Sequence, residues 1–203
     1  RVLGDLPVRS DRLRSTVRQQ FAPEIQPSYA GYIAWRGVCD EAVLSSRTRD
    51  TLFGRFGFGL PDGEQMIGYP VAGAQHSTRS GERRYNFVWY RSARENTELV
   101  NLLTDADGIH YPVGIPPHRV DWRKVHAMRH DAQLILAPQF AEIVEKTAQP
   151  FLQAIYDLSS KQIAFGRVAL MGDASFVARP HVGAGAAQAA ADALAVVDST
   201  QAE

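Results

Sequence analysis

Residues 167–197 read RVALMGDASFVARPHVGAGAAQAAADALAVV. Their apolar start predicts a short buried strand, which ends at Gly172 and Asp173. The alanine-rich stretch 183–197 favours a helix, and it begins with two glycines that let a ligand approach the backbone closely. The unpaired N–H groups of such a helix start, together with its macrodipole, favour negative charge. Taken alone, this pattern predicts either a ligand site or a helix packed closely on a sheet.

The complete spacing of this stretch is more specific. It contains, in order, Gly172-Asp173-Ala174, Pro180, Gly183, Gly185, Ala189 and Asp192-Ala193. This set resembles the flavin-binding signature of the FAD-dependent aromatic hydroxylases, the single-component flavoprotein monooxygenases. The resemblance implies that Asp173 holds the ribityl chain of FAD. It also implies that the loop and helix start lie against the flavin, through Pro180, Gly183, Ala184, Gly185 and Ala186.

A second segment, residues 10–18 (SDRLRSTVR), resembles the ADGxxSxxR motif of the same family. Asp11 and Arg18 match that motif, whereas Arg12 stands where the motif has glycine. The resemblance implies that Asp11 and Arg18 take part in handling FAD and the nicotinamide co-substrate, NADH or NADPH. Apart from the resemblance, apolar residues at four-residue spacing predict a helix over 10–21, capped by Ser10 or Asp11.

Further segments resemble the pyridine-ring hydroxylase branch of the family, of the 2,6-dihydroxypyridine 3-monooxygenase type. They are residues 27–32, 35–37, 68–70 and 86–90, and Arg179-Pro180-His181. The resemblance implies a small aromatic or N-heteroaromatic substrate and O2 as the oxidant. His181 is the candidate catalytic residue, because an imidazole can deprotonate a phenolic substrate or bind its hydroxyl. The alternative is a histidine that only shapes the loop.

The middle of the chain predicts an antiparallel sheet. Strands are expected over 28–39, 53–60, 64–71 and 83–90, and the second and third flank a Pro-Asp-Gly turn. Aromatic residues in these strands fit either a pocket for a flat ring or ordinary core packing. The candidates for substrate contact are Trp35, Tyr69 and Phe87.

The expected fold class is therefore α/β, with the C-terminal part of a Rossmann-like FAD domain and an antiparallel substrate-domain sheet with helices. Helices are expected over 95–103, 119–136 and 139–148, and a strand over 151–158. The expected organisation has three parts. They are the end of an FAD-domain segment at 1–22, a substrate-binding domain at 23–158, and the FAD-domain strand, flavin loop and helix at 159–203.

The composition sets broader limits. The chain has 203 residues, of which 45% are hydrophobic, and its 22 basic and 22 acidic residues balance. These values argue against a disordered chain and give no general attraction to nucleic acid or anionic membranes. The single cysteine, Cys39, excludes an intrachain disulfide and a cysteine-based zinc site, and we expect it to be a buried, inert thiol. No metal site is predicted, and a cytoplasmic protein is the default expectation.

The family begins with a GxGxxG segment that holds the FAD pyrophosphate, and this chain contains no such segment. The chain is therefore expected to be the C-terminal part of a longer enzyme. Two alternatives to a ring-hydroxylating monooxygenase stay open. One is a non-catalytic remnant that serves as a structural or dimerisation module, and the other is a flavin-dependent reductase without oxygen transfer. A homodimer is compatible with each of them.

Overall fold

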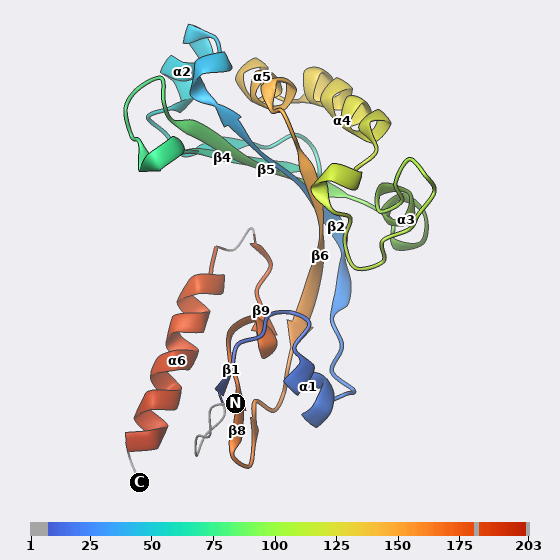
Figure 1. The fold of residues 1–203 in the computed structure, drawn as a ribbon, viewed down its shortest axis with the longest axis vertical. Helices are drawn as coiled ribbons and strands as arrows, with labels where there is room; N and C mark the ends of the chain where they lie inside the picture. The colour runs from blue at the N-terminus through green and yellow to red at the C-terminus, as the bar shows by residue number, and fades with distance from the viewer. Residues whose placement is uncertain (1–7, 181–182, 202–203) are drawn as a thin grey trace. The chain divides into compact units, whose positions relative to one another are not determined.

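The chain forms two compact units in the structure, a computed structural model that describes residues 8–180 and 183–201. The first unit comprises the described residues of 1–30 and 155–203, and the second unit comprises residues 31–154. The long strands β2 (Ser28–Asp40) and β6 (Phe151–Ser159) each pass from one unit into the other (Figure 1). The first unit is therefore discontinuous in sequence, whereas the second unit is one continuous stretch.

The second unit contains the predicted antiparallel sheet. Strand β2 pairs with β5 (Arg84–Ser92), β5 with β4 (Gln65–Val71), and β4 with β3 (Gly57–Gly59). Strand β6 is the neighbour of β2 on its other side. The predicted turn between β3 and β4 is confirmed, because Glu64 N–H donates to the Pro61 carbonyl at 3.0 Å. The strand predicted over 53–60 is shorter than expected, because α2 (Ser46–Leu52) and its C-cap extend to Phe53.

Helices cover one face of this sheet. Helices α4 (Trp122–Ile135) and α5 (Pro138–Lys146) follow the predicted ranges, and Figure 1 shows them above β4 and β5. Alternate residues of the strands are buried beneath these helices, and Trp35 and Phe87 are 2% and 0% exposed. The helix predicted over 95–103 forms as a π-helical turn, Glu95–Leu99, followed by α3 (Val100–Leu102). Cys39 is buried as expected, and this burial raises the pKa of its thiol to about 11.

The first unit contains a small mixed sheet and two helices. Strand β1 (Val8–Arg9) pairs in parallel with β8 (Val168–Leu170), which pairs antiparallel with β7 (Ala164–Phe165). The end of β6 pairs with β9 (Phe176–Val177). The helices are α1 (Thr16–Phe21) and α6 (Gly185–Gln201), and the second confirms the helix predicted for the alanine-rich stretch.

Helix α1 corrects one sequence-based expectation. The predicted helix over 10–21 begins only at Thr16, and its N-cap is Ser15 rather than Ser10 or Asp11. The Ser15 hydroxyl accepts from Arg18 N–H at 3.0 Å, whereas the Asp11 carboxylate accepts from Thr16 N–H at 2.9 Å. Arg12 has φ +67°, in the left-handed region, and a right-handed helix cannot pass through such a residue.

Candidate functional site

The turn after β8 brings distant parts of the first unit together. Gly172, with φ +58°, opens a short 3-10 turn, Gly172–Ala174, and its N–H donates to the Asp192 carboxylate of α6 at 2.8 Å. A Cβ atom at Gly172 would lie 3.3 Å from Ser10 Oγ and 3.6 Å from Ala189 Cβ. Glycine therefore allows this turn, α6 and the segment of the second motif to meet closely.

Asp173 is the exposed residue of this turn, whereas Gly172 and Ala174 on either side of it are buried. Within residues 8–180 and 183–201, its carboxylate forms no hydrogen bond and no ion pair. The fold thus holds the backbone of the turn firmly while the carboxylate points to solvent. A carboxylate in this state can accept hydrogen bonds from the hydroxyl groups of a ligand.

The start of α6 is also accessible. Gly183 has φ +68°, and its N–H donates to the Pro180 carbonyl at 3.1 Å. Apart from the adjoining residues and the helix's own backbone, no described atom lies within 4 Å of the position that a Cβ would take at Gly183 or Gly185. The first turn of α6, which includes Ala186, carries no acidic side chain to neutralise the helix dipole. His181 lies outside the described residues, so its catalytic role stays a prediction.

Arg18 links the second motif to the turn at Asp173. Its side chain is fully buried, and its Nη1 donates to the Ala174 carbonyl at 2.9 Å. Its Nε donates to the Ile25 carbonyl at 3.2 Å, and its Nη2 donates to the Leu13 carbonyl. All of these acceptors are main-chain atoms, so Arg18 positions the turn. Asp11 is exposed, and its carboxylate bonds the start of α1.

Arg12 stands where the motif has glycine, and the structure shows which backbone conformation this position takes. A non-glycine residue in the left-handed region costs about 1–2 kcal/mol, and Arg12 stands at the position where the motif has glycine. The backbone therefore keeps the conformation that glycine adopts readily, although the side chain has changed.

We expect Arg12→Gly to raise the free energy of unfolding by up to about 1 kcal/mol, because relief of this strain exceeds the added entropy of an unfolded glycine. Urea unfolding measures the change. Arg14→Gly is the matched control, since Arg14 lies in the same turn without a positive φ and its replacement should lower stability. A less stable Arg12→Gly protein would contradict the interpretation.

The three substrate candidates lie on different faces of the sheet of the second unit. Trp35 and Phe87 point to the face that α4 and α5 cover, whereas Tyr69 belongs to the opposite face. The ring of Tyr69 stacks on Phe56, with centroids 5.2 Å apart. Strand alternation predicts two faces, but it does not say which of them the helices cover.

The face that carries Tyr69 contains residues that sequence reasoning missed. We call it the aromatic face, and it is formed by Tyr32, Arg36, Phe58, Tyr69 and Tyr90. Tyr32 and Tyr90 meet edge to face, with ring centroids 5.9 Å apart. Arg36 Nη1 donates to Gln153 Oε1 at 2.9 Å. Burial raises the pKa of Tyr90, and the positive charge of Arg36 opposes this rise. The aromatic face therefore combines flat apolar surfaces with the cation of Arg36.

Two kinds of feature are absent from the described residues. No helix within 8–180 and 183–201 has the length and apolar composition needed to cross a membrane. In the same part of the chain, no three His, Cys, Asp or Glu side chains are grouped as a metal ion would require.

Known proteins place this arrangement in a family. A family model described as FAD binding domain-like matches residues 29–157. The chain belongs to this family. The 2,6-dihydroxypyridine 3-monooxygenase of Paenarthrobacter nicotinovorans is 30% identical over 191 residues, which cover 94% of this chain and 47% of the relative. The aurachin C monooxygenase/isomerase of Stigmatella aurantiaca is also 30% identical, over 94% of this chain and 41% of the relative. The chain thus spans about half the length of these curated relatives or less.

A solved structure of the family agrees with the fold. The 2,6-dihydroxypyridine-3-hydroxylase of Arthrobacter nicotinovorans superposes with a TM-score of 0.86 at 30% identity, over 95% of this chain and 48% of that one. The predicted α/β class, with part of a Rossmann-like FAD domain and an antiparallel sheet, is confirmed. The expected resemblance to FAD-dependent aromatic hydroxylases is confirmed by the same relatives. The domain boundaries predicted at residues 22 and 158 stay predictions.

The residues of the first unit fit FAD. The Asp173 carboxylate, which has no partner among the described residues, suits ribityl hydroxyl groups, and the open backbone at Gly183 and Gly185 leaves space for a flat ring. The start of α6 provides positive potential for the negative charge of a reduced flavin.

Proposed function

We propose that this chain is part of an FAD-dependent monooxygenase that hydroxylates an electron-rich aromatic or pyridine ring. The observation that carries the proposal is the junction of Gly172–Ala174, α6 and the buried Arg18, which presents the exposed carboxylate of Asp173. The two 30% identical relatives, both named as monooxygenases, support the same reaction class.

In this proposal Asp173 binds the ribityl chain, and the backbone at Pro180 and at residues 183–186 lies against the flavin ring. FAD supplies the redox and oxygen-transfer chemistry, with NADH or NADPH as reductant and O2 as oxidant. The protein itself contributes binding, orientation and exclusion of water. Arg18 keeps the turn in place through its bond to the Ala174 carbonyl, and Asp11 supports this segment by accepting a hydrogen bond from Thr16 N–H. His181 is the proposed proton-transfer group for the substrate hydroxyl.

We assign substrate contact to the aromatic face. A planar ring packs favourably against tyrosine side chains, and the Arg36 guanidinium suits the oxyanion of a deprotonated hydroxyl group. Of the residues expected from the sequence, Tyr69 belongs to this face. Trp35 and Phe87 support the sheet from its helix-covered side. The second unit would then be the substrate-binding part, and the first unit the FAD-binding part.

The experiment compares the FAD-loaded protein with an Arg36→Met variant. We expect hydroxylated product from pyridinediols or phenols, identified by mass, together with NAD(P)H oxidation. Losing the charge-assisted bond to the substrate should raise KM about tenfold or more without changing the spectrum of bound flavin. Arg47→Met, at an exposed site on α2, is the matched control.

The outcomes separate the parts of the proposal. A complete enzyme containing this chain that binds no FAD would overturn the flavoprotein assignment. NAD(P)H oxidation without any hydroxylated product would favour a reductase. An unchanged KM in Arg36→Met would remove the aromatic face from the substrate site while leaving the reaction class in place.

A further inference from the structure

The second unit contains a cavity on the helix-covered side of its sheet, away from the aromatic face. The cavity has a volume of about 300 Å³ and lies between β2, β5, α4 and the segment that runs from the π-helical turn into α3. Trp35 forms part of its wall, whereas the next residue along the strand, Arg36, belongs to the aromatic face. We propose that this cavity is a second ligand site, which binds a small aromatic carboxylate.

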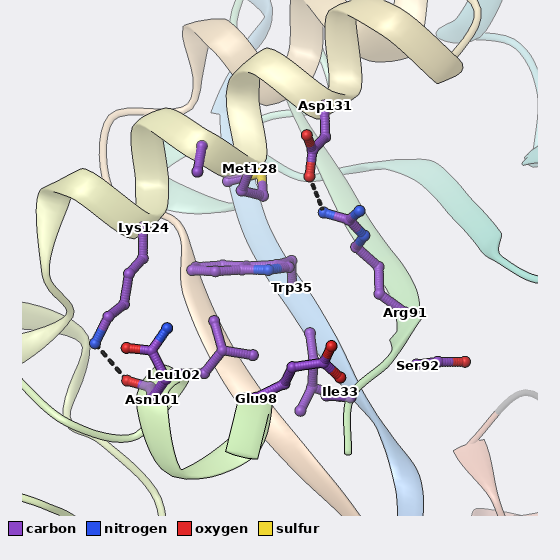
Figure 2. A pocket seen from close by; sticks show the side chains of 12 residues that line it. Ile33, Trp35, Arg91, Ser92, Glu98, Asn101, Leu102, Lys124, Met128 and Asp131 are labelled. Atoms are coloured by element: carbon purple, nitrogen blue, oxygen red, sulfur yellow. Dashed lines mark hydrogen bonds and ion pairs between the residues drawn. The ribbon is translucent and has the colours of Figure 1, made fainter.

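The apolar part of the cavity suits a ring. Trp35, Met128, Leu102 and Ile33 line it, and Figure 2 shows Trp35 between Met128 and Leu102. Contacts of methionine sulfur with aromatic rings are favourable. The volume lies at the lower end of the range for small-molecule pockets, so it admits one ring with a short substituent and excludes larger ligands.

Helix α4 places polar groups at the two ends of this apolar wall. One face of the helix carries Lys124, then Met128 four residues later and Asp131 seven residues later (Figure 2). At one end, the Asp131 carboxylate is already paired with Arg91 Nη1 at 2.8 Å. Arg91 also binds Glu64 at 2.9 Å, so its charge is compensated. The Glu98 carboxylate, also in the wall, binds Arg94 at 3.0 Å.

At the other end, Lys124 differs from these charged neighbours. Its ammonium group donates to the main-chain carbonyls of Asn101 and Thr104, and within the described residues it forms no ion pair. An ammonium group has three N–H donors, so one remains for a ligand. Burial lowers the pKa of Lys124, because the charged form has lost solvent. An anion bound at this end would compensate that loss.

The probe is benzoate, and the neutral isostere benzamide tests whether the charge matters. Ligand-observed NMR titration of the protein should show benzoate binding, with benzamide at least about tenfold weaker because it lacks the charge-assisted hydrogen bond. Lys124→Met should weaken benzoate to the same degree. Lys146→Met, which removes an exposed lysine of α5, is the matched control and should leave affinity unchanged.

Lys124→Met also removes the hydrogen bonds to the Asn101 and Thr104 carbonyls, which could disturb the loop. A second variant therefore tests the cavity while leaving Lys124 in place. Ala127→Phe fills the space from the exposed side of α4 and should abolish benzoate binding while circular dichroism shows an intact fold. Arg36→Met distinguishes this site from the proposed substrate site. Binding that is lost in Arg36→Met but kept in Lys124→Met and Ala127→Phe would place benzoate on the aromatic face and overturn the proposal. A native protein that does not bind benzoate would overturn it as well.

Discussion

Asp173→Ala is expected to weaken FAD binding by about ten- to a hundredfold, since hydrogen bonds to a charged group contribute about 1.5–3 kcal/mol. The reason is that the Asp173 carboxylate has no partner among the described residues, so its bonding capacity is free for the cofactor. For the same reason the protein without FAD should keep its stability within about 0.5 kcal/mol. Titration followed by flavin fluorescence measures the affinity, and urea unfolding measures the stability.

The matched control for this substitution is Asp198→Ala. Asp198 is an exposed carboxylate further along α6, so its removal changes the net charge equally without altering the turn. Equal FAD affinity in native protein and Asp173→Ala would remove Asp173 from the cofactor site. An equal loss in both variants would indicate a general charge effect instead.

Arg18→Met is expected to lower the free energy of unfolding by about 3–5 kcal/mol, because one buried and two partly buried carbonyls lose their donor at once. Arg18 is fully buried and bonds the carbonyls of Leu13, Ile25 and Ala174. Arg14→Met is the matched control, since Arg14 is exposed in the preceding turn, and it should change stability by no more than about 0.5 kcal/mol. Urea unfolding provides the measurement.

Arg18→Lys tests how the residue acts. Lysine keeps the charge but lacks the planar fork that reaches several carbonyls, so we expect an intermediate loss of stability. FAD affinity should fall only to the extent that the Gly172–Ala174 turn shifts. Weaker FAD binding with full stability in Arg18→Met would instead support the direct role in cofactor handling that the motif resemblance implies.

The sheet and the alanine-rich helix were predictable from the sequence because local chemistry defines them. The Pro-Asp-Gly turn between β3 and β4 and the aromatic, β-branched composition of β2 and β5 each have one favoured structure. The start of α1 was not predictable in this way. The left-handed backbone at Arg12 arises from the surrounding fold, and arginine gives no local signal for it.

The candidate site also contains features that the sequence predicts and features that it does not. The spacing of Gly172, Asp173 and the glycines at the start of α6 is local, and the structure joins the turn at Gly172 to α6 through Asp192 and Ala189. The burial of Arg18 was not predictable, because arginine is almost always exposed unless its charge is satisfied. The separation of Trp35 from Tyr69 was not predictable either, since strand alternation assigns residues to two faces without identifying the covered one.

The split composition of the first unit has a consequence for folding. The second unit is one continuous stretch, so its helices and its strands other than β6 are present before residues 155–203 are synthesised. The pairing of β1 with β8 and the bond from Arg18 to Ala174 must await that last segment. Closing so long a loop carries an entropic cost that grows only slowly with length. If residues 31–154 fold first, the compact second unit also shortens the effective loop between the two segments of the first unit. The junction that presents Asp173 therefore forms only after residues 155–192 have been added to the chain.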